Sequence, residues 1–289
     1  MKPQRPFAKV VVVGLGLMGA SLALGLKRRR LAKRVVALGR DAVRLRPALK
    51  AGVVDEASVR TTCVQDADLI LLCGPFALFE RQLKTLALVA PAGCLVTDVG
   101  SVKGPSVARW HAAAGPLHFV ASHPMAGGER TGWRHGSAEL FDGAACLITP
   151  LPQSQRTAVR RVGELWQALG AEVSLCSPAE HDRLVARISH VPHAVAFALA
   201  LAEARGRRLD DFAFAGKGWR DTTRVAASDT QLWADIFLHH PRALARGLKG
   251  LERACAGLRR LIMAGQAGPL RRTLARGADF RRDAGERRR

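Results

Sequence analysis

A histidine in a glycine-rich turn is the side chain of this sequence best suited to proton transfer. It stands in the segment Ser-His-Pro-Met-Ala-Gly-Gly-Glu at 122–129, about a hundred residues after a Gly-x-Gly-x-x-Gly motif at 14–19. Because imidazole titrates near neutral pH, His123 can accept the proton of a hydroxyl that is becoming a carbonyl. A proton acceptor that follows a dinucleotide motif predicts a dehydrogenase.

The motif at 14–19 is interpreted as a dinucleotide-binding turn because of its surroundings. An apolar run at 10–13 leads into it, and an Ala/Leu-rich segment at 20–26 follows it. A strand, a glycine turn and a helix N-terminus in this order can bind a pyrophosphate, since the glycines admit its close approach and the helix amides donate to it. We expect the cofactor to lie against five residues of the motif: Gly14, Gly16, Leu17, Met18 and Gly19.

The end of the second expected strand bears on which cofactor is used. In NAD enzymes an acid ~20 residues beyond the glycines binds the ribose 2′-hydroxyl. Here that place is occupied by Leu38-Gly39-Arg40. Gly39 leaves room for a 2′-phosphate and Arg40 can pair with it, so we predict a preference for NADP over NAD. The next residue, Asp41, leaves NAD as the alternative. If the strand ended one residue later, Asp41 would occupy the position of the acid that binds the ribose 2′-hydroxyl.

Composition limits the class of protein. A chain of 289 residues, 48% of them apolar, can form two domains. Its net charge of +21 raises the possibility of nucleic-acid binding, but the basic residues are spread along the chain and form no reading element. The six cysteines lack metal-ligand spacing, which favours a reduced cytoplasm and no metal. The apolar run at 193–202 is shorter than the ~20 residues of a membrane span, so we predict none.

Strand-like and helical segments alternate through the first part of the chain. The apolar runs lie at 9–13, 35–38, 69–73, 94–98, 118–122 and 144–149. This spacing predicts an α/β domain at 1–177, a Rossmann-type doubly wound parallel sheet with helices on both faces. Ligands of such a sheet bind at the carboxyl ends of its strands, where residues 98–103 and 122–123 also fall.

After a last short strand at 173–176 the pattern becomes helical. Ser177-Pro178-Ala179-Glu180 is typical of a helix start, with a capping hydroxyl, a first-turn proline and an acid three residues on. We therefore predict an all-α substrate-binding and dimerisation domain at 178–275. The basic tail at 276–289 has little apolar content and is predicted to be disordered.

Five segments in this order resemble the prephenate/arogenate dehydrogenase family of tyrosine biosynthesis. They lie at 14–19, 98–103, 122–129, 181–193 and 218–236, and the resemblance extends over about residues 8–265. It implies a small cyclohexadienyl substrate, which loses a hydride from C4 to the nicotinamide while its ring carboxylate leaves as CO₂.

The resemblance also implies roles for individual residues. His123 becomes the catalytic partner of the substrate hydroxyl, and Ser101 a catalytic residue that hydrogen-bonds the same hydroxyl, although Ser101 can also cap a helix at 102–111. Arg224 resembles the arginine that binds the ring carboxylate, for which a guanidinium is well shaped. His193 resembles the residue that reaches the substrate side chain.

Further residues resemble the walls and supports of the family's site. Glu129 resembles one half of an ion-pair gate with Arg224, and Arg220 and Trp233 resemble pocket-wall residues that a partner subunit can supply. The supporting residues on this resemblance are His181, Asp182 and His190. Gly128 stands where relatives often carry a larger side chain, which leaves the choice between prephenate and arogenate open.

The predicted helical domain is too small to bury its apolar faces alone, so we expect a homodimer. Two other functions stay open. One is a 4-amino-4-deoxyprephenate dehydrogenase of secondary metabolism, and the other is a non-catalytic nucleotide-binding or nucleic-acid-binding protein. A 3-hydroxyacid dehydrogenase that shares only the fold would not need the pattern at 181–224.

Overall fold

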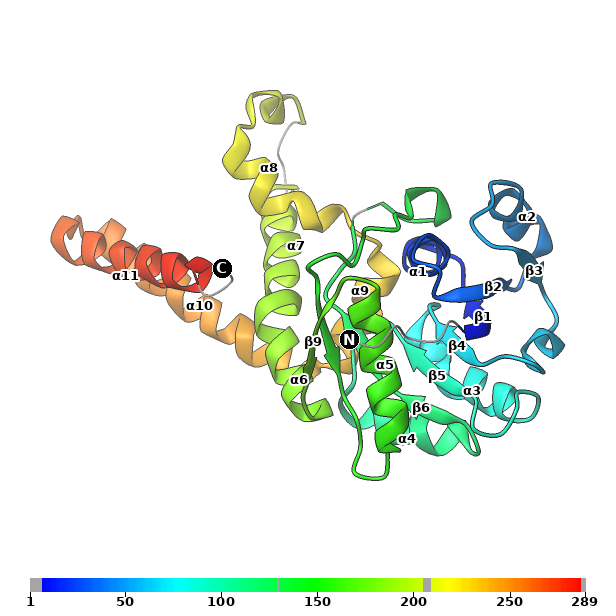
Figure 1. Ribbon diagram of the computed structural model, residues 1–289. Coiled ribbons are helices and arrows are strands. Elements are labelled where there is room, and N and C mark those ends of the chain that lie inside the picture. The colour runs from blue at the N-terminus through cyan, green and yellow to red at the C-terminus, as the bar shows by residue number, and fades with distance from the viewer. Residues whose placement is uncertain (1–6, 129, 205–208, 287–289) are drawn as a thin grey trace. The chain divides into compact units, whose positions relative to one another are not determined.

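The computed structural model describes residues 7–128, 130–204 and 209–286 (Figure 1). The chain forms two compact units, Met1–His240 and Pro241–Arg289. The candidate site lies in the first unit, and each unit is described here by itself.

The first unit contains a sheet of six parallel strands: β1 (Phe7–Val13), β2 (Ala32–Leu38), β3 (Glu56–Ser58), β4 (Leu69–Leu72), β5 (Leu95–Asp98) and β6 (His118–Val120). Their order is β3-β2-β1-β4-β5-β6, which confirms the predicted doubly wound parallel sheet. The short edge strand β3 was not predicted.

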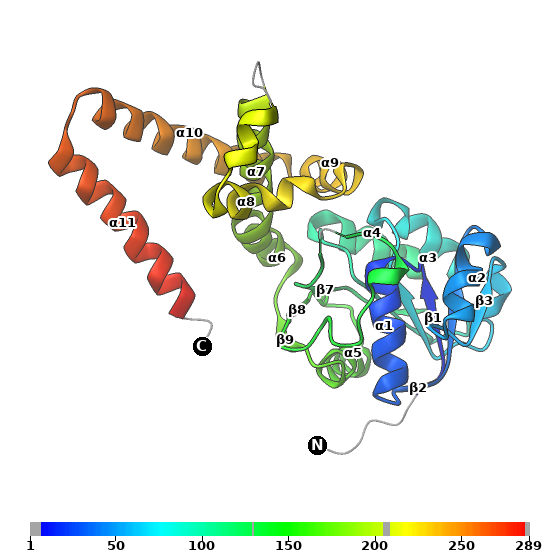
Figure 2. The same cartoon turned by 90° about the horizontal axis from the view of Figure 1, so that it is seen from above.

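Helices cover both faces of this sheet, as Figure 2 shows. They are α1 (Leu17–Arg28), α2 (Ala42–Lys50), α3 (Phe79–Ala87), α4 (Gly104–Ala114) and α5 (Arg156–Ala168). Alternate residues of β1 belong to two separate apolar clusters, Val10 and Val12 with α1, α2 and α5, and Val11 and Val13 with α3 and α4. Burial on both sides explains why this strand is apolar throughout.

A second, three-stranded sheet follows, and here the expectation of one sheet is wrong. It consists of β7 (Ser122–Pro124), β8 (Ala145–Ile148) and β9 (Glu172–Leu175), with β7 antiparallel to β8. The run at 118–122 divides at Ala121, because the Ser122 amide donates to the carboxylate of Asp98 (3.1 Å) instead of continuing the ladder of β5 and β6. This change of sheet sets the direction of the next residue, His123.

The rest of the first unit is helical, as predicted. It contains α6 (Pro178–Val185), a π-helical turn η4 (Ala186–His190), α7 (Val191–Ala204), α8 (Lys217–Thr223) and α9 (Thr230–His239). Ser177 and Glu180 form a reciprocal capping box at the start of α6, which confirms the predicted helix start. Pro192 lacks the amide hydrogen that an α-helical bond would use there, which accounts for the π turn.

The described 3₁₀ turns are η1 (Thr61–Val64), η2 (Phe76–Leu78), η3 (Trp133–His135), η5 (Leu209–Phe214) and η6 (Arg224–Ala227). One described helical stretch, Pro178–Ala204, is long and apolar enough to cross a membrane, although the sequence predicted no span. Core helices of soluble proteins share this length and composition.

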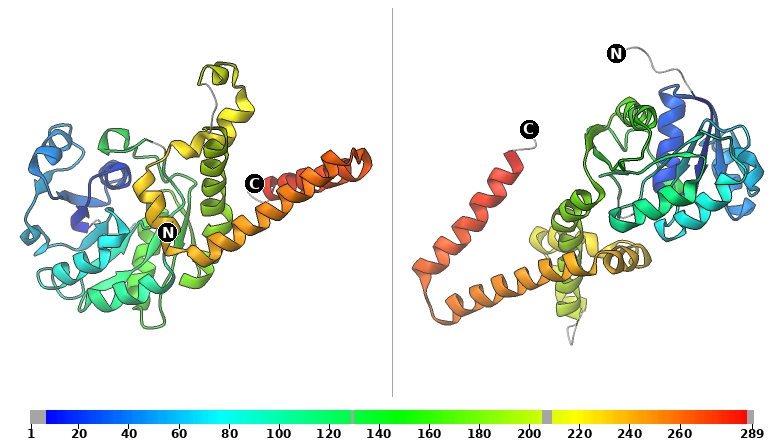
Figure 3. Two further views of the ribbon diagram at one scale, coloured as in Figure 1. Left: turned by 180° about the vertical axis from the view of Figure 1, so that it is seen from behind. Right: turned by 90° about the horizontal axis from the view of Figure 1, so that it is seen from below.

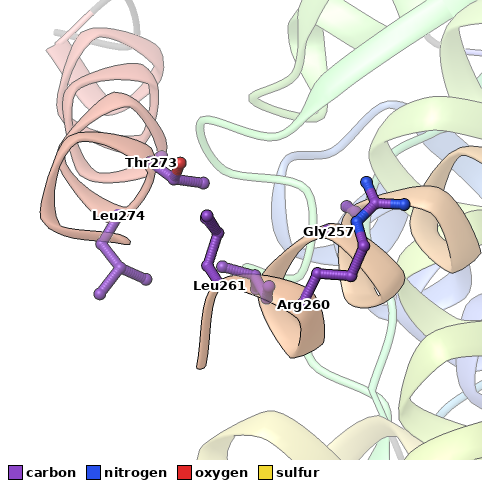
Figure 4. A pocket seen from close by; sticks show the side chains of 8 residues that line it. Gly257, Arg260, Leu261, Thr273 and Leu274 are labelled. Atoms are coloured by element: carbon purple, nitrogen blue, oxygen red, sulfur yellow. The ribbon is translucent and has the colours of Figure 1, made fainter. Parts of the chain in front are cut away.

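The second unit is a pair of helices, α10 (Pro241–Met263) and α11 (Ala267–Glu286), joined at Gly265 (Figure 3). A cavity of about 510 Å³ lies between them, and Leu261 of α10 and Leu274 of α11 contribute to its lining (Figure 4). The prediction of a disordered tail is wrong for residues 276–286, which are helical. Arginine, alanine and leucine favour helix, and Arg282 pairs with Asp279 one turn earlier.

Candidate active site

Two neighbouring cavities of the first unit contain most of the predicted site residues. The larger, about 1020 Å³, is lined by the turn after β1 and by the segment after β2, and we refer to it as the dinucleotide groove. The smaller, about 300 Å³, is lined by Ser101 and His123 among others, and we refer to it as the histidine pocket. Ser228 lines the histidine pocket and the adjacent Asp229 lines the groove, so the two cavities are neighbours.

The turn after β1 has the geometry that a bound pyrophosphate needs. Gly14 has φ +96°, and a Cβ there would lie 2.8 Å from the amide nitrogen of Gly74. A Cβ on Gly19 would overlap the carbonyl oxygen of Gly14, so only glycine allows α1 to pack this closely on the strand. Among the described residues no side chain caps α1, which leaves its first-turn amides for an anionic ligand.

The predicted cofactor residues divide into two groups. Gly14, Gly16, Gly39 and Arg40 line the dinucleotide groove, while Leu17, Met18 and Gly19 belong to α1 and are not among its lining residues. Asp41 also lines the groove. Its Oδ1 accepts a hydrogen bond from the Val43 amide (2.8 Å) and so caps α2. Its Oδ2 lies 3.5 Å from Nε of Arg44, so each of the two carboxylate oxygens already has a partner.

The histidine pocket brings together four predicted residues from separate segments. Ser101 follows β5, His123 lies on β7, His193 on α7 and Arg224 at the start of η6, and all four line the one cavity. The lining residues that sequence reasoning missed are Met125, Ala126, Gly127, Ser189, Val225 and Ser228. Among the described residues no group of three His, Cys, Asp or Glu side chains is placed to hold a metal ion.

A chain of hydrogen bonds runs from Asp182 through His181 to His123. Nδ1 of His181 lies 2.9 Å from the Asp182 carboxylate, and Nε2 of His181 lies 2.8 Å from Nδ1 of His123. Because a carboxylate only accepts, His181 carries its proton on Nδ1, and its Nε2 then accepts the Nδ1–H of His123. This assignment leaves the Nε2 lone pair of His123 available to the pocket.

Asp182 is itself held by several groups. Its Oδ1 accepts the backbone amide of Lys103 (3.0 Å), and its Oδ2 lies 3.5 Å from Nδ1 of His240. Gly104 has φ +30°, and a Cβ there would overlap the Asp182 carboxylate. The start of α4 thus fixes the carboxylate at the far end of the hydrogen-bond chain.

A fully buried ion pair lies behind His123. Nζ of Lys103 lies 2.6 Å from Oδ2 of Asp98 and 2.8 Å from the carbonyl oxygen of Gly100, and both charged side chains are buried. Oδ1 of Asp98 accepts the Ser122 amide. The pair therefore anchors the residue that precedes His123 to the end of β5.

Burial sets the protonation of the two linked histidines. It lowers the pKa of His123 well below its usual value, and His181 and the positive charge of Lys103 act in the same direction. Burial also lowers the pKa of His181, against the opposing effect of Asp182. Both imidazoles are therefore neutral near pH 7, the state in which His123 can take up a proton.

His193 is oriented by its own helix and by an aromatic ring. Its Nδ1 donates to the carbonyl oxygen of Ser189 (2.9 Å) in the π turn, so its Nε2 is the nitrogen left for the pocket. The Trp233 ring stacks on it, with centroids 3.7 Å apart and planes at 20°. π turns inside helices often occur at functional sites, and this one positions both Ser189 and His193.

The remaining predicted residues lie elsewhere. Trp233 is buried behind His193 and is not among the described residues that line the pocket, and Arg220 is exposed on α8, also outside that lining. Glu129 lies outside the described residues. Ser101 does not cap a helix, because α4 begins only at Gly104 and its N-cap is Lys103.

Two family models match the chain. The nucleotide-binding domain of prephenate dehydrogenase matches residues 22–175, and the prephenate dehydrogenase dimerisation domain matches residues 177–276. The cyclohexadienyl dehydrogenase of Zymomonas mobilis is 32% identical over 263 residues, which cover 88% of this chain and 87% of that protein. The prephenate dehydrogenase of Bacillus subtilis is 33% identical over 240 residues, which cover 80% of this chain but only 64% of that protein.

Two solved structures are similar to this chain along nearly their whole length. Prephenate dehydrogenase of Aquifex aeolicus, in complex with hydroxyphenyl propionate and NAD⁺, has a TM-score of 0.90 at 29% identity and covers 98% of this chain and 100% of its own. Arogenate dehydrogenase of Synechocystis has a TM-score of 0.79 at 32% identity, with coverage of 96% and 99%.

Proposed function

The chain belongs to the prephenate dehydrogenase family, and from that premise we propose that it oxidatively decarboxylates prephenate or arogenate with hydride transfer to NAD(P). One observation carries the proposal. Ser101, His123, His193 and Arg224 come from four separate segments and line one cavity of about 300 Å³ next to the dinucleotide groove. A protein that only binds a nucleotide would not need this set.

The residues of the histidine pocket can divide the chemistry among them. Bound NAD(P)⁺ supplies the hydride acceptor. Neutral His123 takes the proton of the substrate's C4 hydroxyl at Nε2 as the C4–H bond breaks and its hydride leaves, while Ser101 hydrogen-bonds the same oxygen. The electron pair of the bond to the ring carboxylate then enters the ring, CO₂ leaves, and His123 returns the proton to the phenolic oxygen.

Two further pocket residues suit the ends of the substrate. The guanidinium of Arg224 is suited to holding the ring carboxylate until CO₂ departs. His193 presents Nε2 toward the substrate side chain, held in place by Ser189 and Trp233. Arg224 lines the pocket from η6, so the ring lies between this arginine and His123 in the proposed complex.

We further propose that NADP is preferred over NAD. Arg40 and Arg44 both line the dinucleotide groove beyond Gly39, where the 2′-phosphate would lie. The acid that carries the alternative, Asp41, is engaged as the cap of α2. An acid already holding a backbone amide and facing an arginine is a poorer partner for a ribose hydroxyl.

We also propose a homodimer in the cytoplasm. The helices of the dimerisation-domain match leave large apolar side chains exposed, among them Leu201, Ile262 and Met263, at 60% exposure or more. The match of residues 177–276 to a dimerisation domain supports a second copy of this chain as the partner. All six cysteines are free thiols, which supports a reducing compartment.

The proposal is tested by following nucleotide reduction at 340 nm with NADP or NAD and with prephenate or arogenate in turn. Turnover with at least one of the four pairs is expected. If all four fail, 4-amino-4-deoxyprephenate is the next substrate to assay, because it differs only in the group that His123 would deprotonate. Failure with that substrate too would leave a binding role.

A further inference from the structure

The segment that connects β7 to β8 is fastened along α1, the helix that follows the glycine turn. The Ser137 amide donates to Oγ of Ser21 (3.1 Å), and Nη1 of Arg29 donates to the carbonyl oxygen of Ala138 (2.7 Å). A Cβ on Gly136 would lie only 2.8 Å from that of Ala20, so the backbone of the segment packs directly on the helix. In Figure 1 and Figure 2 this green segment lies beside α1.

This fastening brings η3 to the wall of the dinucleotide groove. Trp133 and Arg134 line the same cavity as Gly14 and Gly16, although they come from the second sheet's connection and not from the first sheet. The Trp133 indole is half-buried and packs against the apolar cluster beneath α1. It is therefore a fixed platform on that side of the groove.

Arg134 rests on this platform. Its guanidinium carbon lies 4.9 Å from the centroid of the Trp133 ring, a cation–π distance. Among the described residues Arg134 has no ion-pair partner. The three carboxylates that line the groove are engaged elsewhere, since Asp41 caps α2, Asp229 caps α9 and Asp235 accepts the side-chain amide of Gln231 (3.2 Å). An oriented, unpaired cation thus lies in the groove that also contains the turn at the start of α1.

We infer that Arg134, held by Trp133, is a ligand of the dinucleotide's pyrophosphate. The inference rests on the proposed use of NAD(P). The amides of the first turn of α1 would bind the pyrophosphate from one side, and the guanidinium would bind it from the side of the second sheet. The pyrophosphate is common to both cofactors, so Arg134 strengthens the binding of NAD and NADP equally, whereas Arg40 acts on NADP alone.

The test is calorimetric titration of the full-length protein with NAD and with NADP, in the absence of any cyclohexadienyl substrate. Arg134→Ala is expected to raise Kd about tenfold for each cofactor, which leaves their ratio unchanged. Trp133→Leu is expected to raise the Kd values of both cofactors as well, but by a smaller factor than Arg134→Ala. The matched control is Arg160→Ala, which removes an exposed arginine of α5 that pairs with Glu164 and is expected to leave both Kd values unchanged.

Other outcomes would overturn the inference. A loss confined to NADP would assign Arg134 to the 2′-phosphate, and unchanged Kd values for both cofactors would make it a surface residue. If the wild-type protein binds neither dinucleotide, the proposed function itself fails. If the wild-type protein binds both and Arg134→Ala binds them equally well, only the inference about Arg134 fails. Arg134→Gln and a thermal melt of each variant show whether any loss reflects unfolding.

Discussion

His123 presents Nδ1 to Nε2 of His181 at 2.8 Å, and this contact determines which nitrogen of His123 is left for the histidine pocket. Asp182 holds the proton of His181 on Nδ1, so His123 must donate from its own Nδ1. The nitrogen to which we assign the proton transfer is thereby selected by a carboxylate two hydrogen bonds away.

His123→Asn should remove the base and spare the binding of both ligands. We expect kcat to fall by about 10²- to 10⁴-fold with little change in the Kd of the cofactor, because general-base catalysis contributes about that much. Burial lowers the pKa of His123, so wild-type kcat/KM should stay level as pH falls through 6.5 and decline only when the imidazole is protonated at lower pH. A decline centred at or above 6.5 would contradict this assignment.

Asp182→Asn tests the positioning role of the carboxylate. The Asp182 carboxylate raises the pKa of His181, so its loss lowers that pKa. Because His181 is hydrogen-bonded to His123, the acid limb of kcat/KM should move to lower pH while kcat falls about 10- to 100-fold. A purely structural role would lower activity without moving the limb. Gly104→Ala, which crowds the same carboxylate, should lower kcat in the same way. The measurement is the full pH profile of kcat/KM for each variant, compared with that of the wild-type protein.

Lys103→Met should be strongly destabilising. The change leaves Asp98 as a buried charge without its partner, which costs about 3–5 kcal/mol of the free energy of unfolding. Lys27→Met is the matched control, since Lys27 pairs with Asp55 at a half-exposed site and the loss should be about 0–1 kcal/mol. Urea denaturation of the wild-type protein and the two variants measures both losses of unfolding free energy. Equal losses for Lys103→Met and Lys27→Met would contradict the claim that burial makes the Lys103–Asp98 pair costly to break.

Arg40→Ala should change the choice of cofactor. Arg40 lines the dinucleotide groove, where we propose that it pairs with the 2′-phosphate, so its removal is expected to lower kcat/KM with NADP about tenfold while leaving NAD nearly unaffected. Arg81→Ala, on α3 and outside the residues that line the groove, is a control for the loss of one charge. An unchanged ratio of kcat/KM for the two cofactors would show that the preference has another origin.

Much of the fold was predictable because local signals agreed with it. The apolar run of β1, the glycine spacing after it and the capping box at Ser177 each depend on neighbours in sequence. The break between β6 and β7 was not predictable, since it depends on a bond from Ser122 to Asp98, 24 residues away. The helical tail was not predicted, because its dense positive charge is typical of disorder, while the helix propensity of its arginine and alanine residues favours the helix that the structure contains.

The sequence pointed to part of the candidate site but not to its arrangement. The segments that resemble the family contain Ser101, His123, His193 and Arg224, and the structure brings these four residues to one cavity. Ser189 gave no such signal, because its contribution is a backbone carbonyl in a π turn. The linkage of His181 to His123 spans 58 residues, and no periodicity reveals a contact of that kind.

The most direct measurement of the central claim is the ratio of CO₂ released to nucleotide reduced by wild-type protein, with prephenate and arogenate each supplied in turn. Oxidative decarboxylation predicts one CO₂ for every NADPH or NADH formed, and His123→Asn should slow both together. Reduction of the nucleotide without CO₂, or no reduction with either substrate, would contradict it.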